Sequence, residues 1–317
     1  MLQTAREPLF RVKKNRSVEA PAPLAPLADT HGHLTAFRKL SPAEAVARAA
    51  LVGVRLLVVP VDPADDVSDV PEFLAWFSRV RDDAAALLKG AEATEACALL
   101  DELHFVAGVH PYGARKLMED VGVLRRLESL LEDPRCVGVG EFGLDVGPWS
   151  ELGLEEQVPA LRLQLRMAHE RAMPVELHVR DGEGPLATVA HDRSLEVLRE
   201  EGVPAAGCDL HCFTSGPEVM TPFVELGCRI AFGGASTFGR SEDIRAAALT
   251  CPEHLLLSET DSPYMAPVPL RGRECEPAMV AFTVENLARV REESAGVPRQ
   301  RTYDALWHNA LAFFGLE

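Results

Sequence analysis

From residue 27 to the end of the chain, short apolar segments rich in Val, Leu and Ile alternate with longer amphipathic segments. This alternation is typical of βαβ units, in which each strand of a parallel sheet is followed by a helix. Eight segments have the length and composition of buried strands. They are residues 27–33, 55–61, 104–109, 136–140, 174–178, 208–211, 228–232 and 254–259. A closed (β/α)8 barrel requires eight such strands, so the alternation favours that fold.

Helical patterns separate the strand candidates. They cover residues 42–51, 71–88, 122–131, 154–172, 194–201, 217–226, 241–249 and 277–290, and a ninth covers 301–314. Residues 84–103 are long for one connection, and we interpret them as a helical extension or a lid near the third strand. The length of 317 residues would by itself also allow two domains of about 150 residues each.

The sequence therefore predicts an α/β protein with a single (β/α)8 TIM-barrel domain at residues 27–317 and an N-terminal extension before it. Residues 1–26 combine basic side chains with the proline-rich run Ala20-Pro21-Ala22-Pro23-Leu24-Ala25-Pro26, which neither a helix nor a central strand accommodates. We expect this segment to be a flexible leader or linker, and a tether for nucleic acid is the alternative.

Charge and cysteine content narrow the classes of function. The chain has 32 Lys and Arg against 48 Asp and Glu, a net charge of −16, so a protein that coats nucleic acid or an anionic membrane is not expected. Seven cysteines without a C-x-x-C pair favour a reduced, cytoplasmic setting. We find no secretory signal and no apolar run of 18 residues, and we infer no obligate protein partner.

The sharpest local signal is an H-x-H pair at the end of the first strand candidate. Side chains on a strand alternate between its two faces, so His31 and His33 point the same way and can hold one metal ion between them. The alternative is a pair of ordinary surface histidines.

Further polar residues stand at the ends of later strand candidates. Glu141 and Asp145 follow the fourth strand, whereas His178 and His211 end the fifth and sixth and Asp261 follows the eighth. Each alone has an ordinary explanation as a turn residue, a core histidine or a helix cap. Together they favour a common site, because the C-terminal ends of barrel strands converge on one face.

Two further residues, Cys212 and His110, receive other interpretations. Cys212 is adjacent to His211 and should point the other way, so we interpret it as a packing residue. His110 ends the third strand without a partner at ligand spacing, which favours a substrate contact over a metal bond.

These motifs resemble the TatD family of metal-dependent hydrolases, and the resemblance covers about residues 27–317. It rests on Asp29-Thr30-His31-Gly32-His33, Gly108-Val109-His110-Pro111, Gly140-Glu141-Phe142-Gly143-Leu144-Asp145, His178-Val179-Arg180, His211-Cys212-Phe213, Glu259-Thr260-Asp261-Ser262-Pro263-Tyr264, Arg271-Gly272-Arg273 and Asn309-Ala310. The family has a (β/α)8 barrel, two divalent metals and a nuclease-like activity on phosphodiesters in DNA, in several members from the 3′ end.

The resemblance implies two sets of metal ligands that share one carboxylate. The first ion would be held by His31, His33, Asp261 and Glu141, and the second by Glu141, His178 and His211. A ligand set of nitrogen and oxygen without thiolate permits Zn, Mn or Mg.

The resemblance also implies the roles of the substrate-facing residues. Asp261 would orient the attacking water and accept its proton, as a catalytic residue beside Glu141. Phosphate oxygens would be held by Arg180, His110 and Arg271 or Arg273. The net charge favours strand ends and short single strands over duplex interiors as substrates.

The same barrel chemistry leaves two other functions open. One is a hydrolase that acts on an amide, ester or lactone, because the same site can attack a carbonyl group. The other is a non-catalytic scaffold, which a missing ligand would favour, and all six ligand positions are present. Two departures from the family pattern, Cys275 before Glu276-Pro277 and Val146 after Gly143-Leu144-Asp145, stand where we expect substrate contacts.

Overall fold

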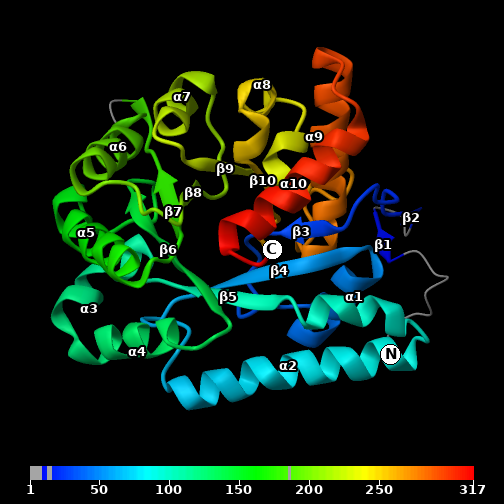
Figure 1. Cartoon of the computed structure of the whole chain (residues 1–317), viewed down its shortest axis with the longest axis horizontal. Helices are drawn as coiled ribbons and strands as arrows, with labels where there is room; N and C mark the ends of the chain where they lie inside the picture. Colours follow the sequence, from blue (N-terminus) through cyan, green and yellow to red (C-terminus); the bar gives the residue numbers. More distant parts are fainter. Residues whose placement is uncertain (1–8, 13–15, 185–186) are drawn as a thin grey trace.

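The structure, a computed structural model, describes residues 9–12, 16–184 and 187–317. The strands of its main sheet are β3 Leu27–Asp29, β4 Val54–Val61, β5 Leu103–Ala107, β6 Cys136–Asp145, β7 Val175–Arg180, β8 Cys208–Leu210, β9 Arg229–Phe232 and β10 Leu256–Ser258. All pair in parallel, in the order β10-β9-β8-β7-β6-β5-β4-β3. The strands form a ring with helices around it (Figure 1).

The two edge strands, β3 and β10, face each other and close most of the remaining gap. The N–H of Thr30 donates to the carbonyl of Ser258 at 3.1 Å, and Oγ of Ser258 donates to the carbonyl of Ala28 at 3.0 Å. Gly32 and Ser262 form an isolated parallel bridge just beyond them. The predicted (β/α)8 barrel is therefore confirmed.

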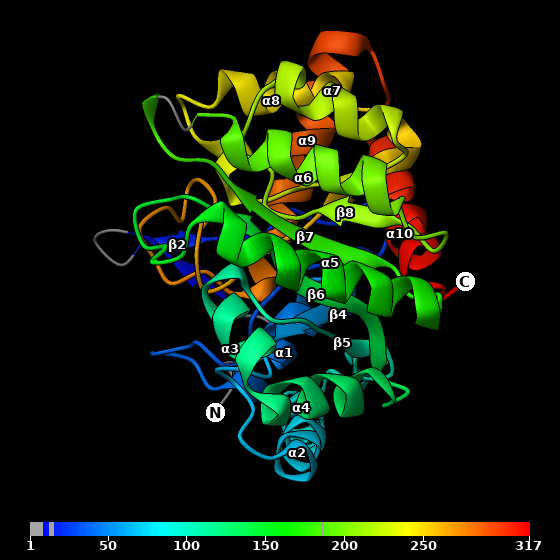
Figure 2. The same cartoon turned by 90° about the vertical axis from the view of Figure 1, so that its left-hand side faces the viewer.

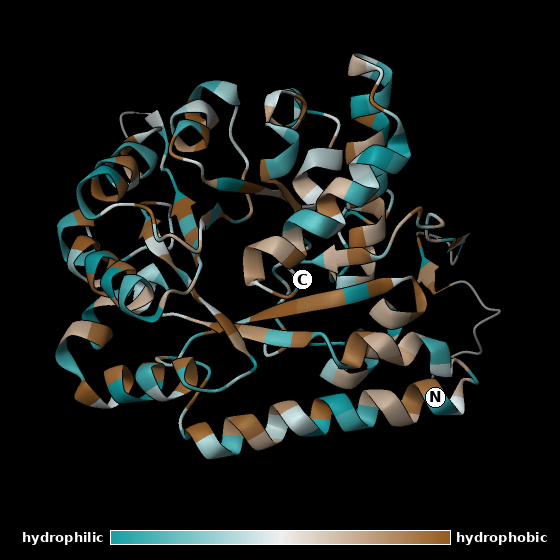
Figure 3. Ribbon diagram, in the orientation of Figure 1, coloured by the Kyte–Doolittle hydropathy of each residue, from teal (hydrophilic) through white to brown (hydrophobic). Residues whose placement is uncertain are grey.

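The helices are α1 Pro42–Leu51, α2 Val70–Gly90, α3 Ala114–Glu119, α4 Val121–Leu131, α5 Leu154–Arg171, α6 Val189–Glu201, α7 Pro217–Glu225, α8 Glu242–Thr250, α9 Val280–Ala295 and α10 Arg299–Phe314. The start of α1 illustrates why they form: Ser41 and Glu44 make a capping box around Pro42 at the first turn. Hydrophobic residues gather on the strands and on the helix faces turned toward them (Figure 3).

The barrel interior is apolar at the end where the strands begin. Leu56 and Val58 of β4 face inward there, and they belong to one buried cluster with Phe313 and Phe314 of α10. The intervening Leu57 and Val59 belong to the larger cluster between strands and helices. In Figure 2 the end of α10 lies on the right, and the loops that follow the strands gather on the left. The C-terminal helix therefore covers one end of the barrel and leaves the other to polar residues.

Several predicted boundaries differ from the structure. The first strand ends at Asp29 rather than at residue 33, because the chain turns away at Gly32 and bridges to Ser262. The fourth strand continues to Asp145 instead of ending at residue 140, since a shift in the β6–β7 register beyond Val139 lets it keep pairing past its glycines.

Residues 84–103 are a helical extension, and the interpretation as a lid is wrong. Helix α2 continues to Gly90, and a 3-10 segment follows at Thr94–Leu100. This segment buries Ala96, Leu99 and Leu100 against α1, α2 and β4. It leads into the beginning of β5, which is the end of the barrel opposite to the strand-end loops.

Part of the N-terminal extension is described. Strands β1 Phe10–Arg11 and β2 Ser17–Val18 pair antiparallel, and Phe10 is buried with its ring edge-on to Phe282. The basic residues Arg6, Lys13 and Lys14 lie outside the described residues, and so does the part of the segment on which the hypothesis of a nucleic-acid tether mainly rests. Within the described ranges, no helix combines the length and the apolarity needed to cross a membrane.

Candidate metal centre

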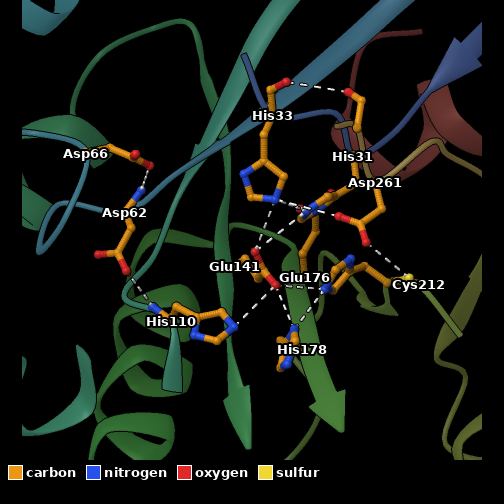
Figure 4. A network of polar contacts seen from close by, with 12 residues as sticks. His31, His33, Asp62, Asp66, His110, Glu141, Glu176, His178, Cys212 and Asp261 are labelled. Carbon is orange, nitrogen blue, oxygen red and sulfur yellow. Dashed lines mark hydrogen bonds and ion pairs between the residues drawn. The ribbon is translucent and has the colours of Figure 1, made fainter. Parts of the chain in front are cut away.

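The six residues predicted as metal ligands meet at the C-terminal ends of the strands, although they are far apart in the sequence. Figure 4 labels five of them, all except His211. Glu141 and His178 belong to β6 and β7, and the others stand in the turns that follow β3, β8 and β10. Parallel strands in a barrel bring these turns to one rim, which is why the sequence spacing of the ligands is irregular.

The first predicted set is compact. Nε2 of His31 lies 3.3 Å from Nε2 of His33, which in turn lies 3.7 Å from Oδ1 of Asp261. Oε2 of Glu141 lies 3.6 Å from His31 and 3.7 Å from His33. All these contacts join groups that can offer lone pairs to one ion.

The side-chain atoms of the second predicted set lie even closer to one another. Oε1 of Glu141 lies 2.7 Å from Nδ1 of His178 and 2.9 Å from Nε2 of His211. The two imidazole nitrogens are 3.2 Å apart. Glu141 thus turns one oxygen toward each predicted set, so both sets could share this carboxylate.

The donor groups fit metal ions because the carboxylates at the centre favour a positive charge beside them. The pKa values of His178 and Glu141 show this preference. Burial alone would lower the pKa of His178, but its hydrogen bonds to Asp145 and Glu141 raise that pKa to about 9. Burial would likewise raise the pKa of Glu141, yet the charge of His211 and the bond from His178 hold it well below its usual range. An ion beside Nδ1 can replace the proton and leave Nε2–H to donate to Asp145 at 3.0 Å.

A buried carboxylate orients the first histidine. Oε2 of Glu176 lies 3.1 Å from Nδ1 of His31, and both side chains are fully buried. With the proton of the ring on Nδ1, the lone pair on Nε2 points at His33 and Glu141. Sequence reasoning passed over Glu176, yet its place two residues before His178 on the same strand puts both on the inner face.

Asp145 was placed among the strand-end polar residues by the sequence but was assigned no role in the site. Its Oδ2 contacts His178 and accepts from the hydroxyl of Tyr112 at 3.0 Å, and its Oδ1 accepts from the N–H of Gly147 at 2.6 Å. Asp145, His178 and His110 form a further group whose ligand atoms lie within 4.8 Å of one another. The signal was present in the Gly-Leu-Asp motif but was indistinguishable from turn chemistry.

His110 stands at the edge of the centre. Its Nε2 lies 3.7 Å from Oε1 of Glu141, and its Nδ1 accepts from the N–H of Tyr112 at 3.2 Å. Burial lowers its pKa to about 3, so the ring is neutral and carries its proton on Nε2, facing the centre. The N–H of His110 donates to Oδ2 of Asp62 at 3.2 Å, which fixes the turn.

The expectation that Cys212 points away is wrong. Strand β8 ends at Leu210, and Cys212 has a φ of 46°, so the alternation of a strand does not extend to it. Its N–H donates to Glu259 at 2.6 Å, and its thiol donates to Oδ2 of Asp261 at 3.4 Å. Burial raises the pKa of Asp261, and the thiol helps to fix the orientation of that carboxyl group.

Within the described residues, Arg180 and Arg271 make no side-chain hydrogen bond or ion pair with the six predicted ligands. Arg180 is the last residue of β7, and its guanidinium carbon lies 4.4 Å from the ring centre of Trp149. Arg271 stands in the loop after β10, 4.2 Å from the ring centre of Phe238. Among the described residues, neither guanidinium is engaged by a carboxylate.

The first of the two departures from the family pattern is not a substrate contact. Cys275 is fully buried and its N–H donates to the carbonyl of Pro263 at 3.0 Å, so that expectation is wrong for it. Its neighbour Glu276 accepts a hydrogen bond from Nη2 of Arg48 at 2.8 Å and ties the loop to α1. Val146 is half-buried and pairs with Arg180 through the backbone at 2.9 Å.

Comparison with known proteins places these observations in a family. Residues 28–315 match the sequence profile of the family described as TatD related DNase. This chain belongs to that family. The uncharacterized metal-dependent hydrolase YcfH of Escherichia coli K12 is 39% identical over 188 residues, which span 59% of this chain and 66% of that protein.

Two further similar proteins support this family membership. The 3′-5′ ssDNA/RNA exonuclease TatD of Erwinia billingiae is 35% identical over 200 residues, 61% of this chain and 72% of that protein. The crystal structure of YjjV, a TatD homologue from Escherichia coli K12, has a TM-score of 0.70 at 26% identity and covers 93% of this chain and 100% of that one. The family predicted from the motifs is therefore confirmed.

Proposed function

We propose that this chain is a metal-dependent hydrolase of phosphodiester bonds, a TatD-like deoxyribonuclease that shortens single strands or strand ends from the 3′ end. The observation that carries the proposal is the position of Glu141, which turns one carboxylate oxygen toward each of two histidine-containing ligand sets. Family membership and the nuclease name of the Erwinia relative support the choice of substrate.

The proposed cofactors are two divalent ions, Zn, Mn or Mg. His31, His33, Asp261 and Glu141 would hold the first, and Glu141, His178 and His211 the second. Such ions lower the pKa of water from about 15.7 toward about 7 and neutralise charge on phosphate oxygens. The remaining chemistry is supplied by the side chains around them.

Asp261 is the proposed proton acceptor. Its Oδ1 faces His33, and among the described residues its Oδ2 is held only by the weak donor Sγ of Cys212, so this oxygen can take a proton from the attacking water. General bases positioned in this way contribute about a hundredfold to ten-thousandfold to the rate.

Three side chains are proposed to hold the substrate phosphate. His110 offers Nε2–H from a neutral ring, as its Nδ1 is engaged by Tyr112. Arg180 and Arg271 keep their guanidinium groups available for a bidentate grip on phosphate oxygens. All seven cysteines are free thiols, which supports a reducing compartment and hence the cytoplasm.

A 5′-labelled single-stranded oligonucleotide tests the proposal. The protein is chelated, each metal is restored in turn, and the products are separated by length. We expect metal-dependent shortening one nucleotide at a time from the 3′ end, and slower action on closed circular duplex. Two bound metals without cleavage of any phosphodiester would contradict the proposal and would leave an amide, ester or lactone as the substrate.

A further inference from the structure

The exposed aromatic side chains of the described chain are confined to the mouth of the barrel. Three of its Phe, Trp and Tyr residues are strongly exposed: Tyr112 at 40%, Trp149 at 66% and Tyr264 at 56%. They stand in the loops after β5, β6 and β10, all at the C-terminal face where the candidate metal centre lies. An exposed aromatic group in such a place indicates a binding surface rather than a packing role.

Trp149 is linked to the candidate metal centre through Arg180. A Cβ at Gly147 would lie 2.8 Å from Nε of Arg180 and 2.9 Å from Oδ1 of Asp145. The arginine side chain therefore runs past Gly147 beside Asp145, and Asp145 contacts the candidate ligand His178. The absence of a side chain at Gly147 lets the guanidinium reach the indole of Trp149, 4.4 Å from the ring centre.

The protein fold does not explain this pair. Trp149 contributes nothing to either buried cluster, and exposing a large apolar ring to water is unfavourable. Arg180 has no hydrogen bond or ion pair from its guanidinium within the described residues, although acidic side chains are abundant in the chain. The indole therefore orders an arginine that is ready to receive an anion, while most of the indole itself stays open to solvent.

We propose that Trp149 is a stacking platform for a base of a single-stranded nucleic acid, at the nucleotide whose phosphate Arg180 binds. This inference rests on the proposed nuclease function and names the unpaired strand as its substrate. Stacking on an indole needs a free base face and tolerates any base, whereas a paired base inside a duplex has both faces covered. The pair thus selects strand ends without reading their sequence.

Variants of Trp149 test the inference directly. With a short oligo(dT) substrate we expect Trp149→Ala to raise KM by about tenfold, with kcat little changed, because one base-stacking contact is lost. Trp149→Phe keeps a ring and should stay close to the wild type. Met118→Ala, at an exposed position in α3, is the matched control and should change neither constant.

A second substrate shows whether the ring contacts a base. A series of oligonucleotides carries one abasic site at successive positions from the 3′ end. For the wild type, one position should raise KM by about the same tenfold factor, and Trp149→Ala should be insensitive at that position. Equal KM values and equal abasic profiles in wild type and Trp149→Ala would overturn the inference while leaving the nuclease function intact.

Failure of the nuclease function has a different signature. Binding of fluorescently labelled oligo(dT) to the chelated wild-type protein is measured by anisotropy, together with cleavage by the metal-restored protein. Wild-type protein that neither binds nor cleaves the strand contradicts the proposed function itself, and with it the role of Trp149. Strand binding that weakens in Trp149→Ala but persists in Trp149→Phe supports the inference apart from any cleavage.

Discussion

At its closed end the barrel is filled by inward-facing Leu56, Val58 and Val106, sealed by Phe313 of α10, whereas at its mouth the inward positions carry histidines and carboxylates. The same strands build both ends, so the difference lies in sequence order along each strand. The early residues of the strands supply the free energy of packing, and the residues at the strand ends supply the candidate metal ligands. The fold thus separates stability from chemistry along the barrel axis.

A layer of buried carboxylates lies between the two ends. Asp29, Glu176, Asp209 and Glu259 are fully buried, and burial raises the pKa of each of them. Three of them have clear tasks: Asp29 accepts from the N–H of Thr260 at 2.8 Å, Glu176 contacts His31, and Glu259 accepts from the N–H of Cys212 at 2.6 Å. The polar mouth is therefore held by a polar layer beneath it and does not rest directly on the apolar end.

The largest expected effect follows from removing a ligand at the mouth. His178→Ala should abolish turnover and lower the metal content, because it deletes contacts to Glu141, His211 and Asp145. Activity assays and elemental analysis measure the two losses. His308→Ala, at an exposed position on α10, is the control. Full activity and wild-type metal content in His178→Ala would contradict the assignment of His178 as a metal ligand.

A substitution at the closed end should lower the stability of the fold and leave catalysis unchanged. Phe313→Ala removes a buried ring and should cost about 3–5 kcal/mol of unfolding free energy, as Phe-to-Ala changes in cores do. Urea unfolding measures this loss, and kcat/KM per folded molecule should be unchanged at low temperature. Phe313→Leu should lose less stability. A fall in kcat/KM without loss of stability would contradict the claim that the closed end supplies stability and the mouth supplies the chemistry.

Removing a substrate-facing charge should have a smaller effect than removing a ligand. Arg180→Ala should lower kcat/KM by roughly ten- to a hundredfold, since a charge-assisted hydrogen bond to phosphate is worth about 1.5–3 kcal/mol. The metal content should stay at the wild-type level, because Arg180 contacts none of the ligands. Loss of metal together with activity would show that Arg180 supports the centre instead.

The smallest effect concerns Asp62, beside the mouth. Burial raises its pKa to about 7, against about 3.9 in an unfolded chain. The folded state therefore holds the proton more tightly, and this group contributes stability at low pH that is lost as pH rises from about 4 to about 7. Asp62→Asn removes the titration, so its Tm relative to wild type should rise over that range. A constant difference in Tm would contradict the buried position of the charge.

Much of the fold was predictable because strands and helices alternate regularly, and the meeting of the six predicted ligands at one rim was predictable because barrel strands end on one face. Alternation along a strand gave His33 as the partner of His31, but it failed at Cys212, where a φ of 46° turns the chain. Asp145 was assigned no role since a Gly-Leu-Asp turn has an ordinary structural explanation. No local pattern predicts that Arg180 stacks on Trp149, because that contact depends on the path of two loops.

The most direct test of the account is the number and position of bound metals in crystals of the loaded protein, measured by anomalous scattering. We predict two peaks, one on each side of the Glu141 carboxylate, and Glu141→Gln should lose at least one of them. A single peak in the wild type, or two peaks away from Glu141, would contradict the bridging role on which the proposed function depends.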